Sequence, residues 1–191
     1  MKRILFICPR NPFSERFSGD VIRAKKFIYF FSKNNYVKVV SPNLKDSKKK
    51  DSRFSYEGFK EVNIFIKIFY IFFSLIKIQP MQLGYFFSPR IKEYVKNKYQ
   101  HYDLIFFQSF RTAQYMPENI KKKCVLDMGD LMSKNYRQTS FQYFFLNPIK
   151  IIYFIESLLV KKYENFCFNK FNKILLLSKR EINSVEKKYK N

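Results

Sequence analysis

The N-terminal segment, residues 1–34, contains the clearest candidate for a phosphate-binding site. An apolar run, Ile4-Leu5-Phe6-Ile7-Cys8, leads through a Pro-containing loop to a helix that we expect to open at Ser18-Gly19-Asp20. A buried strand, a loop with a glycine and a helix N-terminus together offer backbone N–H groups to phosphate. The turn has one glycine, so the multi-glycine dinucleotide fingerprint is absent, and a plain strand-to-helix connection is the alternative.

Cysteine and histidine do not predict a metal site. Cys8, Cys124 and Cys167 are far apart and odd in number, so we interpret them as buried, reduced thiols of a cytosolic protein. No CxxC or CxxH spacing occurs, and His101 is the only histidine, which excludes a histidine-based metal cluster within this chain. We therefore expect neither a metal nor another cofactor.

The charge of the chain predicts an anionic partner. A formal net charge of +22 favours contact with nucleic acid, an acidic membrane surface or a phosphorylated substrate. An AT-rich coding sequence would also enrich Lys, Asn, Ile, Phe and Tyr, without any functional demand. Most aromatic residues fall within apolar runs or helix stripes, as core residues do, and this argues against nucleic acid.

One long apolar segment, Val62 to Ile78, is interrupted by Lys67 and Lys77 and falls short of the roughly 20 apolar residues of a membrane-spanning helix. It predicts either an interfacial helix on a membrane or an ordinary buried helix, and we favour the buried helix. The N-terminus does not resemble a signal peptide, because Pro9 ends its short apolar run.

The elements that position these residues alternate between strand and helix. We expect strands near Arg3–Cys8, Tyr36–Val40, Tyr102–Gln108, Cys124–Asp127 and Lys173–Leu177. We expect helices after Gly19, from Ser88-Pro89, from about Asn147 to Asn169 and from Ser178, and a polar loop over Lys45–Ser55. Ser178 and Glu181 match a capping box.

Two of these helices have apolar stripes that predict their buried faces. The stripe of the first consists of Val21, Ala24, Ile28 and Phe31, and that of the long helix consists of Ile152, Ile155, Leu159, Tyr163 and Phe166. The alternation predicts an α/β fold with a Rossmann-like, doubly wound parallel sheet and flanking helices. Ligands of such sheets bind beyond the carboxyl ends of the strands, where polar groups of Pro9–Asp20, Gln108–Arg111 and Asp127–Asp130 should converge.

Several short motifs, in this order along nearly the whole chain, carry a family resemblance. They are the opening strand with Ser18-Gly19-Asp20, Gln82-Leu83-Gly84-Tyr85-Phe86 with Ser88-Pro89, Ser109-Phe110-Arg111-Thr112-Ala113-Gln114-Tyr115, Asp127-Met128-Gly129-Asp130 with Ser133-Lys134-Asn135-Tyr136-Arg137-Gln138, and Ile174-Leu175-Leu176-Leu177-Ser178. Together they resemble the N-terminal half of family 4 glycosyltransferases, most closely the sugar transferases of bacterial polysaccharide assembly.

The resemblance implies the GT-B fold, in which two Rossmann-like domains face a cleft and the first one holds the glycan or lipid-linked acceptor. Ser18, Gly19 and Asp20 would approach the diphosphate of a nucleotide-sugar donor. Arg111 and Arg137 would contact substrate, and a carboxylate at Asp127 or Asp130 would accept the proton of the acceptor hydroxyl.

Simpler roles remain open for these residues. Either aspartate could instead cap the following helix, which we favour for Asp130, and Arg111 could be a surface arginine that bonds nearby backbone. We expect His101, which precedes a strand, to lie on the surface.

One departure from the family is the donor-binding domain with its E-x7-E glutamate pair, which we expect to be absent from residues 1–191. Glu156 and Glu164 have that spacing, but they lie in an amphipathic helix, where we expect them to face solvent and pair with lysines.

Two functions are consistent with the sequence. In the first, the chain is the acceptor-side domain of a cytoplasmic glycosyltransferase that is inactive alone and peripheral on the inner face of the cell membrane. In the second, it is a non-catalytic basic module that binds an anionic membrane surface or nucleic acid.

Overall fold

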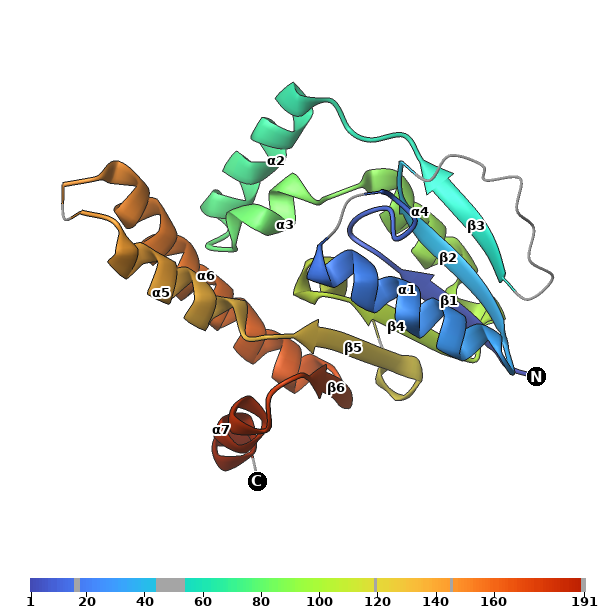
Figure 1. Cartoon of the computed structure of the whole chain (residues 1–191). Helices are drawn as coiled ribbons and strands as arrows, with labels where there is room; N and C mark the ends of the chain where they lie inside the picture. Colours follow the sequence, from blue (N-terminus) through green and yellow to red (C-terminus); the bar gives the residue numbers. More distant parts are fainter. Residues whose placement is uncertain (16–17, 44–53, 119, 145, 190–191) are drawn as a thin grey trace. The chain divides into compact units, whose positions relative to one another are not determined.

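The computed structural model of the chain describes residues 1–15, 18–43, 54–118, 120–144 and 146–189. Its strands form one all-parallel sheet in the order β3-β2-β1-β4-β5-β6 (Figure 1). This is the strand order of doubly wound nucleotide-binding folds, in which the direction of winding reverses beside β1. The predicted Rossmann-like α/β class is therefore confirmed.

The strands are β1 (Arg3–Ile7), β2 (Tyr36–Pro42), β3 (Phe54–Phe59), β4 (Leu104–Gln108), β5 (Cys124–Gly129) and β6 (Lys173–Leu176). The helices are α1 (Gly19–Ser32), α2 (Ile64–Ile76), α3 (Met81–Tyr85), α4 (Pro89–Lys98), α5 (Met132–Gln142), α6 (Pro148–Lys170) and α7 (Lys179–Tyr189), with short 3-10 turns at Tyr99–His101, Phe110–Tyr115 and Lys121–Lys123. The five predicted strands are confirmed. β3 was not predicted. Its first two residues, Phe54 and Ser55, were assigned to the end of the predicted polar loop Lys45–Ser55, and the rest of that loop, Lys45–Arg53, lies outside the described residues.

Packing divides the chain into two compact units. The first comprises Met1–Asn63 and Ser88–Asp127, and the second comprises Ile64–Phe87 and Met128–Asn191. β5 therefore ends in the second unit, where the Leu177 N–H donates to the Gly129 carbonyl over 2.9 Å. The assignment of residues 1–191 to one acceptor-side domain stays a prediction.

The first unit has the core that its apolar runs predict. Every residue of β1 from Ile4 to Ile7 is buried, as expected of a strand covered on both faces. α1 covers one face of the sheet with Val21, Ala24 and Ile28, and α4 covers the other (Figure 1). The predicted cap of α4 is confirmed, since the Ser88 side chain accepts a hydrogen bond from the Ile91 N–H.

In the second unit, the buried face of α6 is not the apolar stripe that the sequence predicts. The buried face of α6 consists of Glu156, Ser157, Val160, Tyr163, Glu164 and Cys167. Of the predicted face only Tyr163 is buried, whereas Ile152, Ile155 and Phe166 are exposed. The predicted buried face of this helix is therefore wrong, although its bounds are confirmed.

α2 likewise buries polar residues and exposes apolar ones. Its buried residues are Lys67 and Ser74, and its phenylalanines and most of its isoleucines are exposed. Our preference for an ordinary buried helix is therefore wrong. Within the described residues, no helix has both the length and the apolar character needed to cross a membrane.

Candidate functional site

The first unit brings polar residues together beside the carboxyl ends of β1 and β4, at the switch point of the sheet. Gln108, the last residue of β4, donates a hydrogen bond from Nε2 to the Asp20 carbonyl at the start of α1 over 2.5 Å. Arg10, which follows β1, donates from Nη1 to Asp20 Oδ2 over 2.8 Å. This is the edge at which doubly wound sheets bind their ligands.

Asp20 is the centre of this cluster. Its Oδ1 accepts the Ser18 hydroxyl over 2.5 Å and the Val21 N–H over 3.0 Å. Burial alone would raise the pKa of Asp20, but the Ser18 hydroxyl, Arg10, the Val21 N–H and Arg111 outweigh it and lower the pKa. An ionised carboxylate therefore occupies the N-terminus of α1, where an anion is most favoured.

Gly19 leaves the approach to this helix N-terminus open. A Cβ atom added at Gly19 would meet no heavy atom within 4 Å. The predicted opening of a helix at Ser18-Gly19-Asp20 is confirmed, with Ser18 at the N-cap position. That phosphate binds here stays a prediction, and Asp20 now holds one of the N–H groups that phosphate would use.

Arg111 lies in a turn that begins at Ser109. Ser109 has φ of 70°, a conformation that L residues rarely adopt, and its N–H donates to the Asp127 carbonyl over 2.7 Å. The turn is held further by the Thr112 hydroxyl, which donates to the Gln108 carbonyl over 2.9 Å. The Arg111 guanidinium is 5.6 Å from the centre of the Phe110 ring. Arg111, like Arg10, lies close enough to Asp20 for its charge to lower the pKa of that carboxyl group.

Asp127 forms a bidentate ion pair with Arg23. Arg23 donates from Nε to Oδ2 over 2.7 Å and from Nη2 to Oδ1 over 2.6 Å, and Asp127 is 2% exposed. Both carboxylate oxygens are therefore engaged by one guanidinium. A role for Asp127 as a base stays a prediction, and it requires Arg23 to leave first.

Neither Asp127 nor Asp130 caps α5, so the capping role considered for each of them is wrong. Leu131 is the N-cap residue of α5 and provides no side-chain cap, while Asp127 pairs with Arg23. Asp130 lies in the second unit and is exposed. The reason is that carboxylates from α6 and α7 occupy the N-terminus of α5.

Glu156 and Glu164 are buried helix caps, so the prediction that they face solvent is wrong. Glu156, 3% exposed, accepts the Met81 N–H over 2.9 Å and the Gln82 N–H over 3.2 Å at the start of α3. Glu164, 2% exposed, accepts the Ser133 N–H over 3.0 Å and the Ser133 hydroxyl over 2.5 Å at the start of α5. Each satisfies donors that a helix N-terminus leaves unpaired.

Glu181 does not form the predicted capping box. Its Oε1 accepts the Leu131 N–H over 3.2 Å, so this carboxylate joins Glu164 at the start of α5. Burial raises the pKa of Glu164, the hydrogen bonds from Ser133 oppose the rise, and the charge of Glu181 adds to it.

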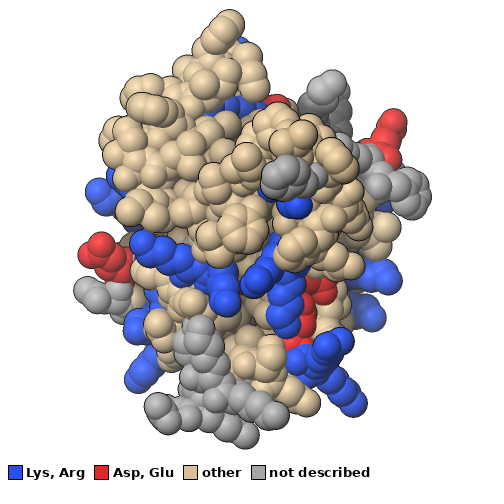
Figure 2. Space-filling model, turned by 90° about the vertical axis from the view of Figure 1, so that its left-hand side faces the viewer, with Lys and Arg blue, Asp and Glu red and all other residues tan. Residues whose placement is uncertain are grey.

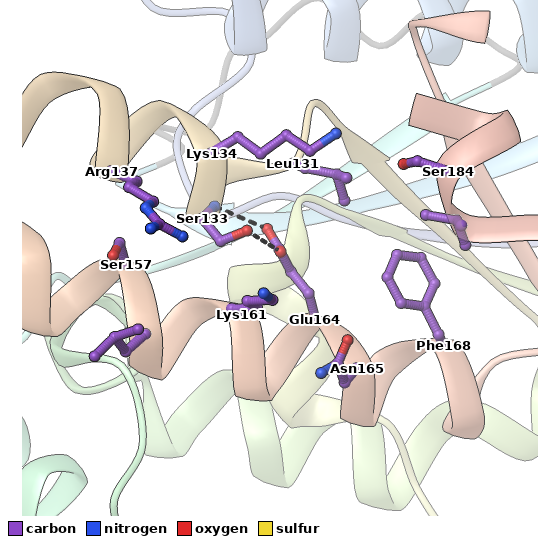
Figure 3. Close-up of a pocket in the computed structure, with 12 residues that line it drawn as sticks. Leu131, Ser133, Lys134, Arg137, Ser157, Lys161, Glu164, Asn165, Phe168 and Ser184 are labelled. Atoms are coloured by element: carbon purple, nitrogen blue, oxygen red, sulfur yellow. Dashed lines mark hydrogen bonds between the residues drawn. The ribbon is translucent and has the colours of Figure 1, made fainter. Parts of the chain in front are cut away.

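Arg137 lines a pocket of about 280 Å³ in the second unit, together with residues of α5, α6 and α7. In Figure 3, Lys134 and Arg137 come from α5 and Lys161 from α6, and the dashed lines join Ser133 to Glu164. The pocket therefore combines basic side chains with a carboxylate that is already hydrogen-bonded. Whether Arg137 binds substrate stays a prediction.

Sequence reasoning missed the side chains that hold the first unit's site together. Arg10 and Gln108 lie within the strand-end segments that were predicted to converge, but neither was singled out. Arg23 was missed as well, because its partner Asp127 lies 104 residues away in the sequence and no local spacing joins the two. His101 is exposed and the three cysteines are buried and free, as predicted.

No group of three or more potential metal-binding side chains occurs in the part of the chain that the structure describes. Comparisons of the chain with protein-family models, with curated proteins and with solved structures found no match.

Proposed function

We propose that this chain is the acceptor-side half of a glycosyltransferase and binds a phosphate-bearing sugar compound at the switch point of the first unit. One observation carries the proposal: Arg10 and Arg111 flank Asp20 beside the carboxyl ends of β1 and β4. Arginine forks match phosphate oxygens, and this sheet edge is the usual ligand position of the fold.

The binding step in this proposal is an exchange of anions. The carboxylate of Asp20 accepts hydrogen bonds from Arg10, Ser18 and the Val21 N–H. A phosphate group offers more acceptor oxygens and more negative charge, so it can take over these donors when it arrives over Gly19. Asp20 thus keeps the donors oriented until the ligand binds.

Sugar transfer also needs a base for the acceptor hydroxyl. Asp127 is neutralised by Arg23. In the proposal, an anionic substrate draws the Arg23 guanidinium away and leaves Asp127 able to accept a proton. By the family resemblance, the diphosphate of the donor contacts this edge, while the rest of the nucleotide is held by a second domain.

The proposal is tested by titrating the full chain with pyrophosphate, UDP, GDP and their sugar conjugates by calorimetry, with thermal unfolding in parallel. Binding to the folded state raises the unfolding temperature in proportion to ligand saturation. We expect Arg111→Gln and Arg10→Gln each to weaken affinity by about tenfold or more, because each loses a charge-assisted bond.

Arg90→Gln is the matched control, since Arg90 is an exposed arginine at the start of α4. It should bind like the unaltered chain. Absence of binding by every compound, or equal affinity of Arg111→Gln and Arg90→Gln, would show that this edge is not a phosphate site.

A further inference from the structure

The outward side of α2 is apolar. Its exposed residues include Phe65, Phe69 and Phe72, with exposed fractions of 76%, 59% and 61%. The full set of exposed large apolar residues in and next to this helix is Ile64, Phe65, Ile66, Ile68, Phe69, Phe72, Phe73, Leu75, Ile76 and Ile78. Scattered surface apolar residues are ordinary, but a helix with its apolar side outward indicates an interaction surface.

This orientation of α2 is held by close packing against α3. A Cβ atom added at Gly84 would come within 2.3 Å of the Tyr70 carbonyl oxygen, so only glycine permits this approach of the two backbones. The Tyr70 and Phe87 rings meet edge to face at 4.9 Å. The ammonium of Lys67 lies 4.7 Å from the centre of the Tyr85 ring. Lys67 and Tyr70 of α2 therefore face α3 and the residues just after it, while the phenylalanines of α2 are exposed.

α3 is in turn attached to the rest of the second unit. Glu156 of α6 accepts the Met81 and Gln82 N–H groups, and the Gln82 side chain donates to the Tyr136 hydroxyl of α5. These hydrogen bonds attach α3 to α5 and α6. Because α2 packs against α3, its position within the second unit is fixed as well, with its phenylalanines exposed.

The charges near this face are basic. The sequence contains no Asp or Glu between Glu61 and Glu93, or between Asp130 and Glu156. Lys77, just after α2, is exposed, with its ammonium 4.8 Å from the Phe73 ring centre. Figure 2, which views the molecule from the left-hand side of Figure 1, shows a broad area of uncharged residues in its upper part, with Lys and Arg side chains below it.

We propose that the exposed face of α2 docks the protein onto an anionic lipid surface, with the helix lying in the plane of the membrane. A helix of 13 residues is about 20 Å long, which is shorter than a bilayer's apolar core of about 30 Å. Phenylalanine enters the boundary between headgroups and acyl chains, and lysine reaches lipid phosphates. A second copy is the less favourable occupant, because each copy carries a net charge of +22.

The first experiment measures co-sedimentation of the full chain with vesicles of phosphatidylcholine alone or with about 30% phosphatidylglycerol. We expect binding to the anionic vesicles that weakens with salt. Phe69→Ser combined with Phe72→Ser should lower the affinity roughly tenfold or more, because less apolar area enters the membrane. Lys77→Gln should lower it by about fivefold.

Phe30→Ser is the matched control, because Phe30 is exposed to a similar degree but lies on α1 in the first unit. It should leave binding unchanged, and circular dichroism establishes that each variant is folded. Equal binding to neutral and anionic vesicles would contradict the electrostatic part of the proposal, and equal binding by the double variant would contradict the docking face.

A second experiment uses the absence of tryptophan from the chain. Phe72→Trp places a single fluorophore on the proposed face, and its emission should shift to shorter wavelength with anionic vesicles. Phe30→Trp should not shift. A shift of Phe72→Trp that depends on protein concentration without vesicles would assign the face to a second copy, and vesicle binding without any shift would assign lipid binding to another surface. Either result overturns the proposal.

Discussion

The two units place charged and apolar residues in opposite ways. In the first unit, apolar strands are buried, and two arginine–aspartate pairs, Arg10–Asp20 and Arg23–Asp127, lie near the carboxyl edge of the sheet. In the second unit, Glu156 and Glu164 are buried while the phenylalanines of α2 are exposed. The same chain thus follows the usual hydrophobic pattern in one unit and departs from it in the other.

The comparison teaches that backbone donors can decide what is buried. A buried carboxylate is costly unless it is hydrogen-bonded, and the N-termini of α3 and α5 each offer unpaired N–H groups. Because α3 and α5 begin against α6, α6 buries two glutamates, Glu156 and Glu164, at positions outside its apolar stripe. On α6, where these carboxylates are buried, most of the apolar side chains are exposed, and on α2, where Lys67 and Ser74 are buried, the phenylalanines are exposed.

The largest effect should come from breaking the buried ion pair of the first unit. Arg23→Met leaves the Asp127 carboxylate buried and uncompensated, so we expect the free energy of unfolding to fall by about 3 kcal/mol. Urea unfolding measures this. Asp127→Asn in the same chain should recover part of the loss, and Arg10→Met, which breaks a more exposed pair, should cost under about 1 kcal/mol. Equal costs for the two arginines would refute the distinction.

The second test concerns the close approach of α2 and α3. Gly84→Ala puts a Cβ atom against the backbone of Tyr70, which cannot yield like a flexible side chain, so we expect a loss of about 2 kcal/mol in thermal or urea unfolding. Gly19→Ala is the control, because its Cβ atom would meet open space; it should change stability by less than about 1 kcal/mol. If the two variants were equally stable, the close packing of α3 would be in doubt.

A smaller loss of unfolding free energy should follow from removing Glu156, the buried carboxylate that caps the start of α3. Glu156→Ala leaves the Met81 and Gln82 N–H groups without their acceptor, at a cost of about 1–2 kcal/mol in unfolding free energy. Glu156→Gln retains one acceptor oxygen and should cost less. Glu93→Ala, at an exposed position of α4, should have little effect. A neutral Glu156→Ala would mean that this carboxylate does not stabilise the helix start.

The smallest effect should be a pH dependence at Glu164. Because burial raises its pKa in the folded state, the unfolded chain releases this proton first as pH rises above about 4. The folded state then binds more protons than the unfolded state, so the unfolding free energy falls with rising pH until the folded-state pKa is passed. Glu164→Gln should lack this decline relative to the unaltered chain as pH rises above about 4. An identical pH profile would show that the pKa of Glu164 is not raised.

Prediction from sequence succeeded where local pattern and burial agree. The runs Ile4–Cys8 and Leu104–Phe107 became buried strands, because continuous apolar segments of this length fit a sheet covered on both faces. Ser88-Pro89 began a helix, because serine accepts from a free N–H and proline lacks one. The strand ends then indicated where Asp20, Gln108 and Arg111 would meet.

Prediction failed where a distant partner decides the environment. The pairing of Arg23 with Asp127 joins residues far apart in sequence, so no short motif could reveal it. Glu156 and Glu164 were placed in solvent because a charged side chain on an amphipathic helix usually lies there. Their acceptor role depends on helices that start elsewhere in the chain.

The sequence by itself determined the α/β class, the strands of the parallel sheet other than β3, and the segments that meet at its carboxyl edge. These follow from apolar runs, capping residues and the fixed direction of parallel strands. Only the tertiary structure decided that glutamates lie inside the second unit and phenylalanines outside. The physical reason is that an unpaired N–H group at a helix start needs an acceptor, and which residue supplies it depends on how helices pack, not on local periodicity.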